Sequence, residues 1–128
     1  MLSEIKYIKV GHFLRGPARN EAERLLSLSE PPTAIFCASD VMAMEAMDAA
    51  KEKGLRIPED LSIVGFDDNP VANYANVPLT TVWQPIAEMG RQAVELLNQI
   101  TDDKKRQPVK VLLDTKLIKR KSCAAPRR

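Results

Sequence analysis

The sequence predicts an α/β fold built on a parallel sheet, because residues 31–68 have the pattern of one β-α-β unit. Two short apolar runs, residues 33–37 and 61–66, flank a segment whose apolar residues recur at helical spacing. Apolar runs without polar alternation are typical of strands covered on both faces of a parallel sheet. We therefore expect two parallel strands, buried on both faces and joined by a right-handed helical crossover.

The helix expected between these strands has both a start signal and a stop signal. Ser39 or Asp40 can cap its first free backbone N–H groups. Gly54 can adopt the left-handed conformation that ends a helix, and Pro58 prevents the helix from resuming. The residues expected on its buried face are Ala43, Ala46, Met47 and Ala50.

Two elements are expected before this unit. Residues 4–10 alternate polar and apolar side chains, which predicts a strand. Pro17 is typical of the first turn of a helix, and an amphipathic pattern continues from there to about Leu28. Serines and prolines in residues 27–32 end this helix before the first apolar strand.

The last part of the chain predicts an extended segment, a helix and a strand. Residues 77–82 contain a proline and are expected to form a linker or strand. Pro85 begins a helix whose apolar stripe reaches Ile100, and residues 109–118 alternate as a strand does. Burial of apolar surface contributes about 25 cal/mol per Å². This helix is therefore expected either to fold back onto the same chain or to pack in another copy of it.

Composition restricts the class of protein. A chain of 128 residues fits one ordinary domain. Its apolar runs are shorter than the ~20 residues of a membrane span, and its N-terminus lacks a signal peptide's apolar segment, so we expect a cytosolic protein without a membrane partner. Cys37, Cys123 and the single histidine, His12, have no metal-ligand spacing. We expect two free thiols, no metal site and no cofactor.

The net charge of +2 conceals a basic C-terminal segment. Residues 101–128 carry a local charge of +7, and the first hundred residues carry −5. Such a segment can contact nucleic-acid phosphates, or it can be a solvated, partly frayed terminus. Because it has no interleaved aromatic residues and no helix-turn-helix or zinc pattern, we favour the solvated terminus.

Polar residues follow both strands of the β-α-β unit. Ser39 and Asp40 come after the first strand, and Asp67 and Asp68 come after the second. Ligands of such sheets bind beyond the carboxyl ends of the strands, so these residues predict a binding site. The aspartate pair has three interpretations, namely a ligand contact, a cap for a helix that begins at Pro70, or a magnesium or phosphoacceptor site.

Three motifs resemble, in their order and spacing, the ligand-binding core of the lactose and galactose repressor (LacI/GalR) family of bacterial transcription regulators. They are PTAIFCASDVMAMEAM, GLRIPEDLSIVGFDD and PLTTVWQPIAEMGRQAVELL. The resemblance implies a type I periplasmic-binding-protein-like fold, with two Rossmann-like α/β lobes around an effector cleft and a helix-turn-helix headpiece before them. No headpiece is recognisable in these 128 residues, so the fold is expected to be incomplete.

The resemblance also implies how the chain is divided. Residues 1–84 correspond to part of the C-terminal lobe, and residues 85–104 to a helix that normally belongs to the other lobe. Residues 105–128 correspond to a return strand and a basic tail. The first strand-helix unit of the C-terminal lobe, where the family places an effector-binding arginine, has no counterpart here.

The resemblance assigns effector contacts to Phe13, Ser39 and Asp67, with Asp68 in a structural role. Phe13 matches an aromatic residue that lies against the effector, with ordinary core packing as the alternative. Ser39 stands where many members have asparagine, which leaves the effector's identity open. Trp83 is either a packing residue near the hinge or a wall of the effector site.

A side-by-side dimer interface is implied by the same resemblance. It would contain Val41, Met44, Val71 and Tyr74, although Val41 and Met44 are also consistent with the periphery of the core. The expected partners are therefore a second copy of the chain and a small-molecule effector. DNA is expected as a partner only through a headpiece that this sequence does not contain.

These features predict the effector-binding and dimerisation region of a repressor that senses a small sugar or purine. Such a region is a switch module and not an enzyme, because the sequence shows no nucleophile, base and orienting residue around Asp67 and Asp68. The alternative is a periplasmic sugar-binding protein of a transport system. That alternative requires a signal peptide, which the sequence does not show.

Overall fold

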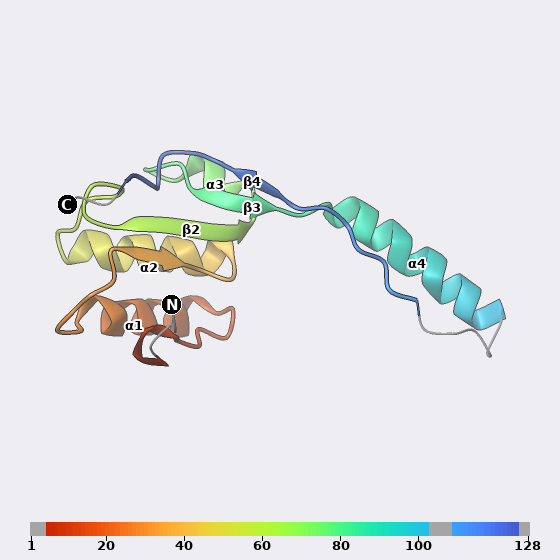
Figure 1. Cartoon of the computed structure of the whole chain (residues 1–128), viewed down its shortest axis with the longest axis horizontal. Coiled ribbons are helices and arrows are strands. Elements are labelled where there is room, and N and C mark those ends of the chain that lie inside the picture. The colour runs from red at the N-terminus through yellow and green to blue at the C-terminus, as the bar shows by residue number, and fades with distance from the viewer. Residues whose placement is uncertain (1–4, 103–108, 126–128) are drawn as a thin grey trace.

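A computed structural model describes residues 5–102 and 109–125 as an α/β lobe from which one long helix projects (Figure 1). The α/β fold with a mainly parallel sheet is thus confirmed. In chain order the elements are the 3-10 helix η1 (Ile5–Tyr7), α1 (Arg15–Leu26), β1 (Ala34–Phe36), α2 (Asp40–Glu52), β2 (Ser62–Asp67), α3 (Val71–Tyr74), β3 (Thr80–Trp83), α4 (Ile86–Asp102) and β4 (Lys116–Ile118).

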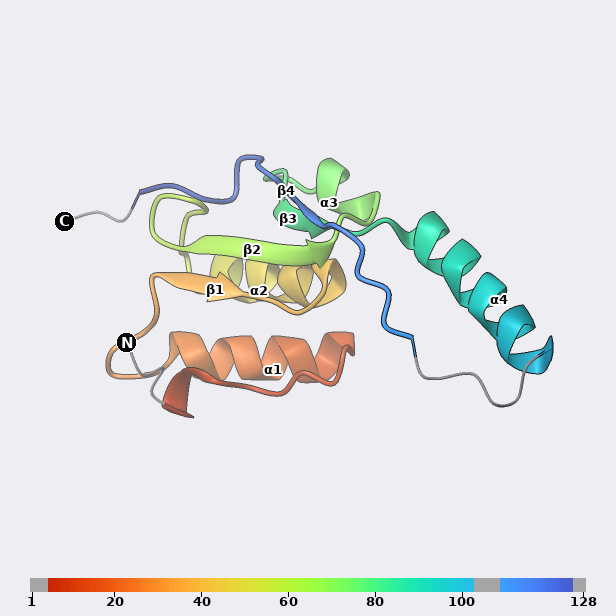
Figure 2. The ribbon, with the colours of Figure 1, turned by 45° about the vertical axis from the view of Figure 1, so that its right-hand side comes forward.

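The sheet has the strand order β1-β2-β3-β4. Strands β1, β2 and β3 are parallel, with Ile35 opposite Ile63 and Val64 opposite Thr80, and β4 is antiparallel to β3. The three parallel strands therefore end at one edge of the sheet, which we call the carboxyl edge (Figures 1 and 2). Helix α2 begins at this edge, and α4 leaves the lobe from it.

The core lies between the sheet and α2, with α1 packed on the outer side of α2. The start and stop signals of α2 are confirmed. The Ser39 side chain accepts a hydrogen bond from the Met42 N–H (3.2 Å), and Gly54 has a φ of 74°. The predicted buried face is also confirmed, and the least accessible apolar residues of the core are Ala43, Ala46, Ala49, Ala50, Leu61, Ile63, Ala72 and Leu79.

The prediction that β1 and β2 are buried on both faces is wrong. Helix α2 covers one face, whereas Phe36 is 64% exposed on the other. Its ring contacts Phe66 edge to face, with 6.4 Å between ring centroids. Within the described residues no helix covers this second face, so the outward side chains of both strands keep contact with solvent. Apolar composition alone does not reveal whether a second covering layer is present.

The strand predicted at residues 4–10 does not form. Residue 4 lies outside the described residues, Ile5–Tyr7 form a 3-10 turn, and residues 8–10 are extended without pairing to any described strand. Ile8 and Val10 are exposed. A strand is stabilised by backbone bonds to a neighbour, and the alternating pattern is not sufficient without one.

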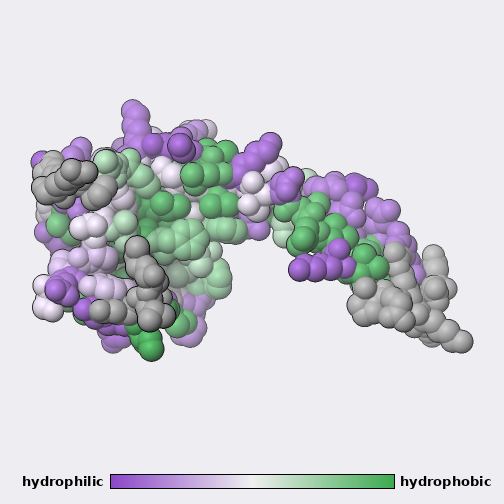
Figure 3. All heavy atoms as spheres, viewed as in Figure 1, coloured by the Kyte–Doolittle hydropathy of each residue, from purple (hydrophilic) through white to green (hydrophobic). Residues whose placement is uncertain are grey.

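Helix α4 projects from the lobe, and residues 84–85 and 109–115 form the two connections to it (Figure 1). Of the two expected arrangements, folding back onto its own lobe is not seen in this structure, and packing in another copy stays a prediction. Apolar atoms gather on its inner side, which faces the lobe across open space (Figure 3). On the polar side, hydrogen bonds from Arg91 and then Gln92 lower the pKa of Glu88 to about 2. The exposed apolar residues of α4 are Ile86, Met89, Val94, Leu97 and Ile100.

Residues 119–124, after β4, lie against the sheet, which corrects the prediction of a solvated terminus for this part of the basic segment. Ser122 is inaccessible; its Oγ donates to the Ile63 carbonyl (2.6 Å) and accepts from the Thr80 N–H (2.8 Å). The Lys121 N–H donates to the Pro78 carbonyl (2.9 Å). We call residues 119–124 the return segment. Residues 103–108 and 126–128 of the basic segment lie outside the described residues.

The predicted strand at residues 109–118 is shorter than expected, since only Lys116–Ile118 pair with β3. Both cysteines are free thiols, and burial, followed by the charge of Asp40, raises the pKa of Cys37 to about 12. Across the described ranges, no helix combines the length and apolar character that crossing a membrane requires.

Candidate functional site

Asp40 organises the polar residues at the carboxyl edge. Its side chain is inaccessible to solvent although it lies in the first turn of α2. The Asp40 Oδ1 accepts a hydrogen bond from the Thr81 hydroxyl (2.5 Å), and Oδ2 accepts one from the Asn69 backbone N–H (2.6 Å). One carboxylate thus joins α2, β3 and the loop after β2. We refer to Asp40, Thr81 and Asn69 as the Asp40 network.

The loop after β2 has an unusual backbone. Asp67 has a φ of 111° and Asp68 a φ of 54°, and such values are uncommon for residues with a side chain. The Asp40 network contributes the bond that holds Asn69, immediately after them. Two successive residues in this region are retained where surrounding contacts fix them, and such positions cluster at functional sites.

The two aspartates of this loop have different partners. Asp67 is half-buried, and its Oδ1 accepts a hydrogen bond from the Gln84 side-chain amide (2.7 Å). Asp68 Oδ1 accepts from Arg120 Nη2 (2.7 Å), while Arg120 Nη1 donates to the Leu79 carbonyl (2.9 Å). Asp68 therefore anchors the return segment, whereas Asp67 lies farther along the carboxyl edge beside the end of β3.

Of the three interpretations of the aspartate pair, the cap of the following helix is not supported. Helix α3 begins after Pro70 and has no side-chain hydrogen bond at its cap. Asp68 is occupied by Arg120, and Asn69 enters the Asp40 network through its backbone.

Burial raises the pKa of Asp40, and the nearby charges of Asp67 and Asp68 raise it further. The hydrogen bonds from Thr81 and Asn69 act in the opposite direction. The carboxyl edge thus concentrates three carboxyl groups, and burial opposes ionisation of Asp40.

Phe13 lies in the loop that leads into α1. It is 67% exposed with a φ of 57°, so the alternative of ordinary core packing is wrong. The same loop approaches the start of α2 closely, since a Cβ added to Gly11 would lie 2.7 Å from Met42 Cε. Ser39 precedes α2 and is buried as its cap. No hydrogen bond joins Phe13 or Ser39 to Asp67 within the described residues, and their effector contacts stay predictions.

Trp83 and Asp67 are partners in the register of β3 and β2. The indole is half-buried, and the Lys116 Nζ lies 5.5 Å from the centroid of its ring. Trp83 therefore packs under a cation at the point where the chain leaves the lobe, close to the Asp67 loop.

The four residues predicted for a dimer interface differ in exposure. Tyr74 is 84% exposed and Val71 is 38% exposed. Val41 and Met44 are half-buried, and Met44 lines a shallow cavity of about 230 Å³. Their role in dimerisation stays a prediction. The cavity is also lined by Met47, Leu55, Ile57 and Val77.

We expect Arg120→Ala to lower the free energy of unfolding by about 2–3 kcal/mol. The change leaves the half-buried Asp68 carboxylate and the Leu79 carbonyl without their donor. Urea denaturation of the purified chain measures the loss. The matched control is Lys119→Ala, because Lys119 is the exposed neighbour and its loss is expected to change stability by less than about 0.5 kcal/mol. Equal effects of the two changes would contradict the structural role of Arg120.

Sequence reasoning missed part of this arrangement. Thr81, Gln84 and Arg120 have no motif that marks them, and their partners lie 41, 17 and 52 positions away.

The magnesium interpretation of the aspartate pair also lacks support. Among residues 5–102 and 109–125, no group of three or more potential ligands is arranged to hold a metal ion.

The fold and site define a ligand-binding α/β lobe, with polar loops at the carboxyl edge of a parallel sheet. Residues 7–123 match the periplasmic binding protein-like domain, so the chain belongs to this family. Its relatives place it with the LacI/GalR regulators, which confirms the resemblance.

Two curated relatives are transcription repressors. The chain is 48% identical over 92 residues to the HTH-type transcriptional repressor CytR of Escherichia coli (strain K12), a match that covers 72% of this chain and 27% of CytR. It is 35% identical over 122 residues to the HTH-type transcriptional repressor PurR of Aliivibrio salmonicida, covering 95% of this chain and 37% of PurR. The chain thus spans only about a quarter to just over a third of these relatives.

Two solved structures have the same fold. A transcriptional regulator CelR-cellobiose complex superposes with a TM-score of 0.89 at 34% identity, covering 95% of this chain and 37% of CelR. The lac repressor dimer bound to operator and the anti-inducer ONPF superposes with a TM-score of 0.77 at 34% identity, covering 85% of this chain and 38% of the repressor chain.

Proposed function

We propose that this chain is the effector-binding and dimerisation region of a bacterial repressor that responds to a small sugar or purine. The observation that carries the proposal is the Asp67 loop, a strained polar loop at the carboxyl edge of a lobe that superposes on CelR in its cellobiose complex. A carboxylate is a strong acceptor for sugar hydroxyls or a purine N–H. Asp67 is the proposed acceptor, Phe13 supplies an apolar wall, and Ser39 lies at the border of the site.

The proposed mechanism is a shift between two arrangements of lobes. Residues 1–84 form part of one lobe, residues 85–104 bring α4 to a second lobe, and residues 105–128 return to the first. An effector held between the lobes favours one arrangement, because it binds the two with different affinity. A DNA-binding headpiece outside these 128 residues would transmit that difference to DNA in the cytoplasm. The named repressor relatives favour this function over sugar transport or enzymatic activity.

The test places residues 7–123 in CelR in exchange for its matched region. Repression by this chimaera is measured with cellobiose, ribose, adenine and guanine as candidate effectors. Asp67→Ala is expected to weaken the response to the active effector about 10- to 100-fold, because one or two charge-assisted hydrogen bonds are lost. Glu59→Ala is the control, since Glu59 is an exposed acid before the start of β2. An unchanged response in Asp67→Ala would contradict the role of Asp67.

We expect the 128-residue chain to form at least a dimer. Two surfaces support this expectation. The first contains the exposed Val71 and Tyr74 with the half-buried Val41 and Met44, and the second is the apolar stripe of α4. A specific interface buries roughly 800 Å² per partner, an area that the two surfaces would supply together.

Sedimentation over a hundredfold range of concentration measures the association. Tyr74→Lys and Leu97→Lys test the two surfaces separately, since both side chains are exposed in the single chain and tolerate a charge there. The surface whose variant is monomeric is the main interface. A monomeric wild-type chain at the highest concentration would contradict both assignments.

A further inference from the structure

The Thr81 hydroxyl forms two hydrogen bonds at the carboxyl edge. It donates to Asp40 Oδ1 (2.5 Å), and it accepts from the Asp68 backbone N–H (3.4 Å). The Thr81 side chain is inaccessible to solvent, as that of Asp40 is. A hydroxyl has one donor hydrogen and two lone pairs, so both bonds form together. The bond to Asp40 orients the hydroxyl, because it uses the only hydrogen and leaves a lone pair for Asp68.

Two successive backbone N–H groups after Asp67 are therefore held by one pair of side chains. Thr81 accepts from the Asp68 N–H, and Asp40 Oδ2 accepts from the Asn69 N–H (2.6 Å). Asp67 and Asp68 have φ values of 111° and 54°. Residues with a side chain keep such values where surrounding contacts fix them. The two bonds are contacts of this kind, and they follow immediately after Asp67.

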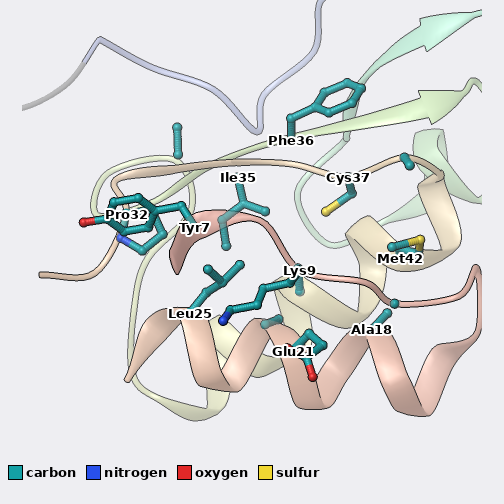
Figure 4. Close-up of a pocket in the computed structure, with 15 residues that line it drawn as sticks. Tyr7, Lys9, Ala18, Glu21, Leu25, Pro32, Ile35, Phe36, Cys37 and Met42 are labelled. Carbon is teal, nitrogen blue, oxygen red and sulfur yellow. The ribbon is translucent and has the colours of Figure 1, made fainter. Parts of the chain in front are cut away.

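The support behind these bonds is closely packed. Thr81 lies opposite Gly65 in the register of β3 and β2, and the Asp40 carboxylate fills the space where Gly65 has no Cβ. Cys37 and Met42, which flank Asp40 in the sequence, border an apolar cavity of about 330 Å³ (Figure 4). Asp40 instead forms its bonds with β3 and with the loop after β2. The pair of Asp40 and Thr81 is thus a fixed support, built on α2 and β3, for the Asp67 loop.

We propose that Thr81 is a positioning residue for Asp67, and that its hydroxyl fixes where the Asp67 carboxylate meets the effector. Thr81 is buried behind the loop and acts through the backbone of Asp68. The inference rests on the proposed role of Asp67 as the acceptor for the effector. Hydrogen bonds are confined to distances of about 2.5–3.2 Å, so a small displacement of the loop weakens the bond between Asp67 and the effector.

The first experiment tests the loop in the complete 128-residue chain, without any effector. Thr81→Val replaces the hydroxyl by a methyl group of similar size, whereas Thr81→Ser keeps the hydroxyl. In NMR-detected hydrogen exchange, Thr81→Val is expected to speed exchange of the Asp68 amide at least about tenfold, because hydrogen-bonded amides are protected. Thr81→Ser is expected to change this rate by less than about threefold.

Ser122→Ala is the matched control for the loss of a buried hydroxyl. Ser122 is also inaccessible, and its Oγ also donates one bond and accepts one, to the Ile63 carbonyl and from the Thr80 N–H. These partners lie near the amino ends of β2 and β3, at the opposite end of the strands from Asp67. The control is expected to lower stability and to leave exchange of the Asp68 amide within about threefold of the wild type.

The second experiment measures the effector response of the CelR chimaera with cellobiose, ribose, adenine and guanine. Thr81→Val is expected to raise the effector concentration for a half-maximal response about tenfold, with changes below about threefold for Thr81→Ser and Ser122→Ala. In a chimaera that already carries Asp67→Ala, Thr81→Val is expected to have no further effect, because the two residues act as one unit.

The outcomes separate this inference from the proposed function. Unchanged exchange of the Asp68 amide in Thr81→Val, or equal acceleration in Ser122→Ala, would overturn the positioning role of Thr81. A weaker response in Asp67→Ala but not in Thr81→Val would overturn it as well. So would a Thr81→Val effect that persists in full in the Asp67→Ala chimaera.

Two further outcomes concern the chimaera itself. A chimaera that responds to none of the four compounds would contradict the proposed effector class, and exchange of the Asp68 amide then decides whether Thr81 holds the loop. If Thr81→Val does not fold, Thr81→Ala provides the same comparison, since it also lacks the hydroxyl and introduces no new methyl group.

Discussion

Gly65→Ala is expected to destabilise the lobe by about 3–5 kcal/mol. A Cβ at this position would collide with the Asp40 carboxylate and lie 2.9 Å from Leu79 Cδ2. Neither neighbour has free space, because both are inaccessible parts of the core. Overpacking alone costs about 1–3 kcal/mol, and displacement of a buried carboxylate from its donors adds to that cost.

Urea denaturation followed by the fluorescence of Trp83, the single tryptophan, measures this loss. Gly16→Ala is the matched control, since nothing lies within 4 Å of the added Cβ and the residue is in α1. The control is expected to raise stability by up to about 1 kcal/mol through helix propensity. A Gly65→Ala protein as stable as the control would show that α2 and β2 are less closely packed than described.

Asp40→Ala is expected to lower the free energy of unfolding by about 2–4 kcal/mol at neutral pH. The change leaves the Asn69 N–H and the Thr81 hydroxyl without their acceptor at a buried position. Asp40→Asn retains an oxygen for one of these donors and is expected to lower the free energy of unfolding by less than Asp40→Ala does. Asp48→Ala is the control, because Asp48 is an exposed aspartate of the same helix.

The Asp40→Asn variant also tests the raised pKa of Asp40. A native pKa above the unfolded-state value means that the native state binds the proton more tightly. The contribution of Asp40 to stability is then complete below the ordinary pKa of an aspartate and is lost as pH rises through the native pKa of Asp40. We expect the stability of the wild type relative to Asp40→Asn to fall as pH increases from about 4 toward 7. A difference that rises over this range would contradict the direction of the shift.

Local sequence signals were sufficient for the elements that depend on local chemistry. The Ser39 cap, Gly54 and the small-residue face of α2 identified that helix, because caps and periodicity act within a few residues. The position of Asp67 at the end of β2 followed from the order of strand and polar residues. These signals give no information about which surfaces other parts of a protein cover.

The errors concern long-range partners. Asp40 has the sequence context of a helix cap, and nothing near it identifies Asn69 or Thr81, which are 29 and 41 positions away. The basic residues around Arg120 suggested solvation, although its partner Asp68 is 52 positions earlier. Residues 8–10 have a strand's pattern but no neighbouring strand. In each case the missing information was the identity of a contact that forms only after the chain has folded.

The return segment has a consequence for biosynthesis. Ser122 follows Ile63 by 59 positions, which correspond to about 3–12 s of translation at ~5–20 residues per second. The Ile63 carbonyl lacks the Ser122 hydroxyl for the whole interval, and the Thr80 N–H lacks it for the last 42 positions. Strands β2 and β3 are therefore synthesised before the residue whose hydroxyl joins them, and the return segment completes their hydrogen bonds.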